Sequence, residues 1–132
     1  MADPIYIAMK VPIYSVRIYV AVGASADQLM QYFKTKKVKL TATDTEAIRE
    51  TIEPNNEAFA YQLEDAGRFL IWLSKYDKSP RRIQALVHEI THTTLHIFEH
   101  IDAEITNSSH EPLCYLHDYI TGECLKRLSK LV

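Results

Sequence analysis

The segment 88–92, with the sequence His-Glu-Ile-Thr-His, holds the residues of this chain that are best suited to chemistry. His88 and His92 are four residues apart, so on a helix they lie about 40° apart on one face. Their imidazoles can therefore bind one metal ion together. Glu89 lies beside them, where a carboxylate can take a proton from a metal-bound water. The motif is typical of metal-dependent hydrolases.

The residues around the motif predict a long helix that carries it. Ser79 can cap the start of this helix, and Pro80 suits its first turn. The helical pattern continues through the motif to about His100 or Ile101. A loop is expected at 106–110, and a last helix is expected from near Glu111-Pro112 to near Lys130. The motif helix and the last helix should therefore be neighbours.

The N-terminal half predicts a small sheet. The stretch 14–22 is rich in Tyr, Val and Ile and indicates a strand, whereas 5–10 is a short apolar segment. A helix capped by Ser25 or Asp27 should follow and run to about Lys36. The segments 58–63 and 69–73, separated by Glu-Asp-Ala-Gly, indicate a β-hairpin. In the second of these strands, Phe69 and Trp72 are expected in the core behind the motif helix. The order of elements predicts an α+β domain spanning 1–132, with a small sheet packed against long helices.

Composition argues against several classes of function. The formal net charge of the 132-residue chain is −2, which gives no attraction to nucleic acid or to an anionic membrane. The lysines at 34–39 are best interpreted as a solvated helix end. The apolar stretch 13–22 is too short and too polar to span a bilayer, and the N-terminus lacks the basic region of a signal peptide.

The cysteines favour a reducing compartment. Cys114 and Cys124 are ten residues apart on the predicted last helix, too far apart for a disulfide within it. We therefore expect two reduced thiols and a cytoplasmic protein.

A catalytic zinc site needs a third protein ligand and an open position for water. Glu111 is the candidate, because the eighteen residues 93–110 allow a loop that returns the next helix antiparallel to the motif helix. His96, His110 and Cys114 remain alternative groups that could contact the metal. Tyr115 follows Glu111 by four residues, so its hydroxyl could donate to an oxyanion, although a core aromatic is the simpler interpretation.

The segment 111–115, Glu-Pro-Leu-Cys-Tyr, resembles the E-x-x-A-Y element that follows H-E-x-x-H in gluzincins, with Cys in place of Ala. Small single-domain phage proteins are similar in the motif helix and in 111–120. The resemblance covers about 79–120, roughly a third of the chain, and implies a minimal zincin-like domain. It implies that His88, His92 and Glu111 are the zinc ligands and that Glu89 is the general base. For a phage-encoded protein, the compartment would be the cytoplasm of the host cell.

The leading hypothesis is a zinc metallopeptidase that hydrolyses a peptide or protein substrate, with Glu89 and Tyr115 as catalytic residues. A strand edge beside the site would align an extended peptide by backbone pairing. The alternative is a catalytically silent, zinc-stabilised structural or interaction protein of a phage. An open fourth coordination position favours the enzyme, whereas its occupation by Cys114, His96 or His110 favours a structural site.

Overall fold

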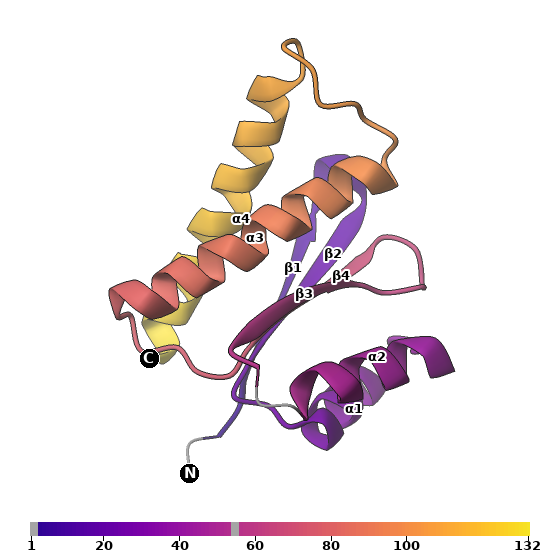
Figure 1. Cartoon of the computed structure of the whole chain (residues 1–132), viewed down its shortest axis with the longest axis vertical. Coiled ribbons are helices and arrows are strands. Elements are labelled where there is room, and N and C mark those ends of the chain that lie inside the picture. Colours follow the sequence, from indigo (N-terminus) through magenta and orange to yellow (C-terminus); the bar gives the residue numbers. More distant parts are fainter. Residues whose placement is uncertain (1–2, 54–55) are drawn as a thin grey trace.

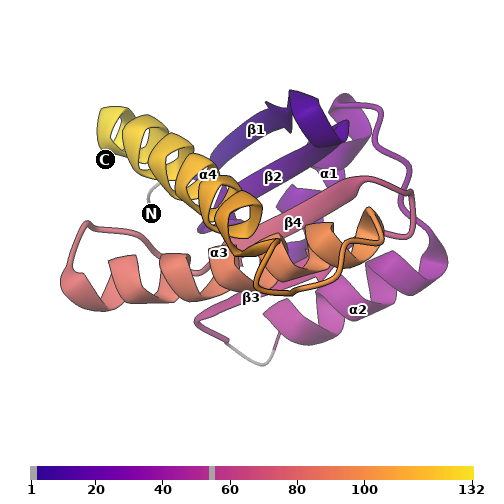
Figure 2. The same ribbon diagram turned by 90° about the horizontal axis from the view of Figure 1, so that it is seen from above.

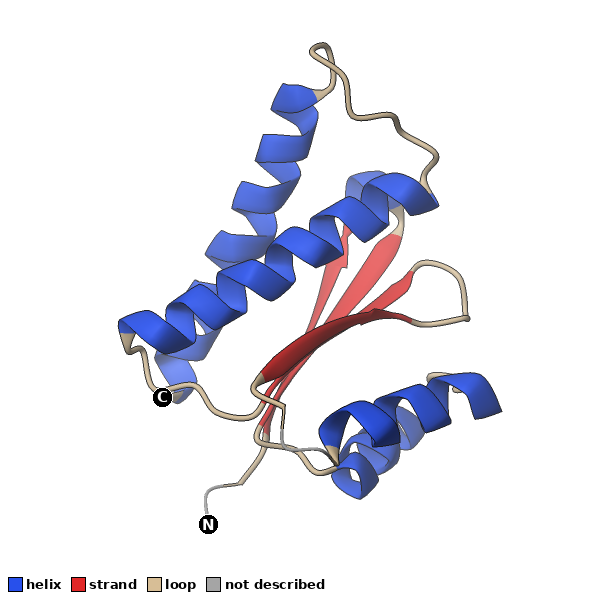
Figure 3. Ribbon diagram, viewed as in Figure 1, coloured by secondary structure: helices blue, strands red, loops and turns tan. Residues whose placement is uncertain are grey.

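A computed structural model describes residues 3–53 and 56–132 of the chain. Its helices and strands form a four-stranded mixed sheet with two long C-terminal helices packed on it, which confirms the predicted α+β class (Figures 1 and 3). The strands are β1 (Ile5–Val11), β2 (Val16–Val22), β3 (Ala58–Gln62) and β4 (Arg68–Leu73). The helices are α1 (Ala26–Thr35), α2 (Ala42–Ile52), α3 (Pro80–His100) and α4 (His110–Leu131), with a 3₁₀ turn, η1 (Pro12–Tyr14), between β1 and β2.

The strands lie in the order β1-β2-β4-β3, so β1 and β3 are the two edge strands of the sheet. β2 and β4 are parallel to each other, and each edge strand is antiparallel to its neighbour. The predicted hairpin is confirmed as β3 and β4. Two elements were not predicted from the sequence. They are the strand β1 at 5–11 and the helix α2 at 42–52.

Helices cover both faces of the sheet (Figures 1 and 2). Side chains of α3 and α4 pack against one face, and those of α1 and α2 pack against the other. Successive residues of β4 therefore enter different cores. Phe69 packs beneath α3 as predicted, whereas Trp72 is a core residue of the opposite layer, where its Nε1 donates to the Ala24 carbonyl at 2.9 Å. This follows because successive side chains of a strand point to opposite faces of the sheet.

The helix that carries the motif begins where the sequence predicts. Ser79 is its N-cap and accepts a hydrogen bond from the Arg82 backbone N–H at 3.4 Å, and Pro80 occupies the first turn. Ser25, rather than Asp27, caps α1, and it forms a capping box with Gln28. No helix in the part of the chain that the structure describes is long and apolar enough to cross a membrane.

The edge of the sheet formed by β1 is capped by side chains of α4. The Tyr119 hydroxyl donates to the Lys10 carbonyl at 3.2 Å, and Arg127 Nη1 donates to the Ala8 carbonyl at 2.7 Å. These carbonyls face away from β2, which is where an added strand would have to pair. The β1 edge is therefore partly satisfied within the chain.

The edge formed by β3 is open. Backbone hydrogen bonds to β4 at both ends of the strand, at Glu57 and Leu63, show that odd-numbered residues pair with β4. In an antiparallel ladder the alternate residues then turn their N–H and C=O groups outward. These are Ala58, Ala60 and Gln62, and the hydrogen bonds found among the described residues include none from a side chain to their backbone groups.

The two cysteines are free, as predicted, and their environments differ sharply. Cys114 is exposed, whereas Cys124 is buried and its burial raises the pKa of its thiol to about 12. We expect iodoacetamide at pH 8 to modify Cys114 at least about a thousandfold faster than Cys124, because the buried thiol must wait for the chain to open. Intact-mass analysis over time should show a single fast addition, which Cys114→Ser should abolish. Equal labelling of both thiols in the native protein would contradict this packing of α4.

Candidate metal centre

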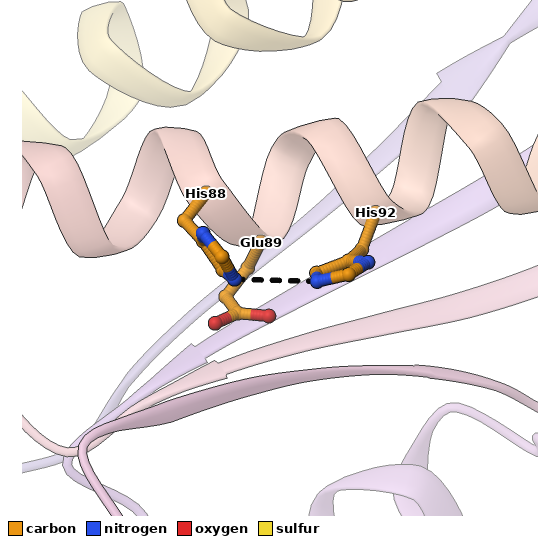
Figure 4. Close-up of side chains that lie close together, drawn as sticks. All are labelled: His88, Glu89 and His92. Atoms are coloured by element: carbon orange, nitrogen blue, oxygen red, sulfur yellow. Dashed lines mark hydrogen bonds between the residues drawn. The ribbon is translucent and has the colours of Figure 1, made fainter.

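Three side chains of α3 come together in a group that could hold a metal ion. His88, Glu89 and His92 each offer one ligand atom, and these atoms lie within 4.8 Å of one another. The Nε2 atoms of the two histidines are 3.2 Å apart (Figure 4). The sequence-based expectation that the two imidazoles share one helical face is confirmed.

The separation of the two nitrogens fits two ligands of one ion. Zn–N bonds of 2.0–2.1 Å at a tetrahedral angle would place the two ligand nitrogens about 3.3–3.4 Å apart. The rings are 75° from coplanar with centroids 4.8 Å apart, and both histidines are exposed. In one tautomeric arrangement an N–H of one ring can donate to the other, so the pair is also a reasonable contact by itself.

Glu89 is the buried member of the group, with 8% of its surface exposed. Burial raises the pKa of its carboxyl group, and the neighbouring His88 and His92 act in the opposite direction. A carboxyl group with a raised pKa is better suited to taking up and returning a proton near neutral pH. The environment of Glu89 therefore suits proton transfer.

The group projects from the side of α3 that faces β3 and away from α4 (Figure 4). Next to it lies a cleft of about 550 Å³ between the start of β3 and the first turns of α3. Ala58 and Ala85 contribute small side chains to this cleft, and His88 and Glu89 line it as well. The remaining lining residues are Asn56, Glu57, Arg81 and Gln84. The metal-binding group thus borders a polar cleft beside the open strand edge.

Two arginines clamp Glu57 at this cleft. Arg81 Nε and Nη2 each lie 3.2 Å from a different oxygen of the Glu57 carboxylate, and Arg82 Nη1 lies 3.1 Å from Oε1. The hydrogen bond from Arg81 holds the pKa of Glu57 below its usual range. Sequence reasoning did not find these residues, because the two arginines are more than twenty positions from Glu57. No spacing rule connects positions so far apart.

Glu111 lies exposed in the first turn of α4 and is not a member of the metal-binding group found among the described residues. The buried stripe of α4 includes Leu116 and Ile120, which face the sheet and α3. Glu111 lies about 140° around the helix from Leu116, so packing this stripe turns Glu111 toward solvent.

Tyr115 also lies outside the metal-binding group, in different surroundings. Its side chain is 67% exposed, so it is neither a core aromatic nor part of the cleft at His88. It lies on an apolar groove of about 530 Å³ between η1 and α4, together with Ile13 and Tyr119. Two of the alternative groups considered for this site, His110 and Cys114, are likewise outside the three-residue group.

The remaining histidines of the two long helices have separate surroundings. The His96 ring centroid is 6.3 Å from that of His92, and His96 Nδ1 is buried with no hydrogen-bond partner among the residues described. His117 Nε2 is 3.0 Å from Thr91 Oγ1 at the contact between α3 and α4. Cys114 and His117 line a small cavity of about 150 Å³ at that contact. Thr91 of the motif therefore faces α4, whereas the metal-binding group faces β3.

The site can accordingly be described as two exposed imidazoles that could share an ion, with a buried carboxylate next to them. Imidazole nitrogens are common ligands of zinc, copper, iron and nickel ions. No model of a known protein family matches the chain, and neither a curated protein sequence nor a solved structure matches it.

Proposed function

We propose that this chain is a zinc-dependent metallopeptidase of zincin-like architecture. The observation that carries the proposal is the 3.2 Å separation of the His88 and His92 nitrogens beside the buried carboxylate of Glu89. A zinc ion held there supplies Lewis acidity toward a water and a carbonyl oxygen. Glu89 accepts the proton of the attacking water and returns it to the leaving amine nitrogen.

The open edge of β3 supports a peptide as the substrate. Ala58, Ala60 and Gln62 offer outward N–H and C=O groups to an extended chain, by the alternation of the antiparallel ladder. The side chains of Phe59 and Tyr61 pack toward α1 and α2, so the alternate residues face the α3 side, as Ala58 does. A peptide added to this edge would run beneath the side chains drawn in Figure 4.

Zinc binding can be tested independently of any substrate. We expect about one zinc per chain by elemental analysis after dialysis, because two neutral imidazoles and one further ligand form a tight site. His88→Ala and His92→Ala should each weaken zinc binding at least about a hundredfold, since each removes a ligand. His100→Ala is the matched control, because this histidine lies on the same helix and outside the group, and it should bind zinc like the unmodified protein.

The third ligand is tested in the same assay. Glu111 remains our proposal from the gluzincin resemblance, and it requires the first turn of α4 to approach the histidines. Glu111→Ala should then weaken zinc binding as strongly as the histidine variants do. An unaffected Glu111→Ala would remove Glu111 from the site and leave a water or Glu89 as the third ligand. Absence of zinc from the unmodified protein, even after exposure to the ion, would overturn the metallopeptidase proposal.

The second candidate is a zinc-stabilised structural or interaction protein without turnover. Glu111 lies outside the metal-binding group found among the described residues, which counts against turnover because a catalytic zinc site has three protein ligands in place. This candidate predicts bound zinc that raises the unfolding temperature with no cleavage of any peptide. Cleavage of a mixed fluorogenic peptide library that a chelator stops and zinc restores would exclude it.

A further inference from the structure

The cleft beside the metal-binding group is lined by one guanidinium group, that of Arg81, and by the carboxyl groups of Glu57 and Glu89. Arg81 and Arg82 both contact Glu57, so two guanidinium groups face one carboxylate. The hydrogen bond from Arg81 lowers the pKa of Glu57. Arg82, which also interacts with Asp77, does not line the cleft. Asn56 and Gln84, which do line it, are uncharged.

Arg81 has hydrogen-bonding capacity that Glu57 does not use. A guanidinium group has five N–H donors, and Arg81 gives one from Nε and one from Nη2 to Glu57. Its Nη1 has no partner among the residues described, and its side chain is 78% exposed. Arg82, which is 23% exposed, also holds Glu57. Glu57 would therefore stay anchored while Arg81 contacts a ligand.

The cleft lies in the path of a peptide that pairs with β3. Ala58 is the first residue of the strand whose backbone groups face outward, and it lines the cleft together with His88 and Glu89. The small side chains of Ala58 and Ala85 leave a volume of about 550 Å³, enough for a substrate side chain or a chain end. The peptide segment next to the metal would thus enter the cleft and meet Arg81.

We propose that this cleft binds a carboxylate of the substrate peptide and that Arg81 recognises it. This proposal rests on the proposed peptidase function, which places the peptide along β3. A planar guanidinium group binds a carboxylate through parallel N–H donors, and this geometry favours it over an amide of the same shape. The carboxylate can belong to an Asp or Glu side chain or to the C-terminus of the peptide.

The test measures binding, so that it does not depend on turnover. Zinc-loaded and metal-free Glu89→Gln protein is titrated with fluorescein-labelled Ala-rich octapeptide amides, in which one Glu is moved along the sequence. Matched peptides carry Gln at the same position, and one further all-Ala peptide ends in a free carboxylate. We expect binding about five- to tenfold tighter for Glu than for Gln at one position, or for the free acid than for its amide. The first result identifies a side chain as the source and the second a chain end.

The protein variant then identifies the recognising group. Arg81→Gln should remove the preference for the carboxylate, whereas Lys75→Gln, an equal change of charge at another exposed position, should keep it. Equal binding of Glu and Gln peptides at every position, together with equal binding of acid and amide, would overturn this proposal alone. Failure of every peptide to bind the zinc-loaded protein would overturn both this proposal and the peptidase function. The comparison between peptides needs no Arg81 variant, so it holds even if that variant does not fold.

Discussion

Glu89→Gln is expected to keep about one zinc per chain and to lower peptide cleavage at least about a hundredfold. The amide has nearly the shape of the carboxylate, so the buried position can accept it without repacking. It cannot take the proton of the attacking water, because an amide has no basic oxygen of comparable strength. The zinc content and the rate of cleavage of a fluorogenic peptide are both measured on the same preparation.

The matched control for this variant is Glu99→Gln, which makes the same chemical change at an exposed position of α3. It should keep both the zinc content and the cleavage rate. A Glu89→Gln protein that cleaves peptide at the normal rate would show that Glu89 is not the base. A protein that loses zinc instead would show that Glu89 is a ligand, which would assign the third coordination position to it.

Asp44→Ala is expected to lower the free energy of unfolding by about 3 kcal/mol, the larger of the stability effects that we foresee. Asp44 is fully buried, and its Oδ1 accepts hydrogen bonds from the Tyr61 hydroxyl at 2.9 Å and from the Glu64 backbone N–H at 3.1 Å. Its Oδ2 accepts from the Thr41 backbone N–H at 3.2 Å. Removal of the carboxylate leaves these donors without partners in a partly buried region. Chemical denaturation monitored by circular dichroism measures the loss.

A Tyr61 variant measures how much of the stability lost in Asp44→Ala comes from the hydrogen bond between these two residues. Burial, followed by the hydrogen bond to Asp44, raises the pKa of Tyr61 to about 12. Tyr61→Phe should cost about 1 kcal/mol, and the double variant should cost less than the sum of the two single variants. Glu46→Ala, at an exposed position of the same helix, should change stability by less than about 0.5 kcal/mol. A loss below about 1 kcal/mol for Asp44→Ala would contradict the described burial of this carboxylate.

The features predicted correctly from the sequence are those set by local geometry. Ser79 and Pro80 mark the start of α3 because capping depends on a few adjacent residues. The approach of His88 to His92 follows from the helical repeat alone. The hairpin was recognised because two apolar segments with strand-like composition lie on either side of a short polar turn.

The features that were missed depend on distant contacts or on weak local signals. α2 contains several threonines and isoleucines, which are poor helix formers, although its capping box of Thr41 and Asp44 was present in the sequence. The exposure of Tyr115 depends on which face of α4 is buried, and this face is set by the buried stripe along the whole helix. The clamp of Glu57 by Arg81 depends on where β3 begins relative to α3. Contacts between residues so far apart in the sequence cannot be predicted from a short sequence window.

In the part of the chain that the structure describes, side chains of α4 bind carbonyls at the β1 edge of the sheet but not at the β3 edge, and this difference affects how copies of this chain can associate. Polymerisation by strand addition needs two free edges on each molecule, one for each neighbour. Tyr119 and Arg127 occupy two carbonyls at the β1 edge, so the β3 edge is the less obstructed of the two among the described residues. Pairing of β3 with β3 of a second copy uses this edge in both molecules and favours a pair over a fibre. In such a pair each copy would cover the edge that we propose to bind peptide in the other.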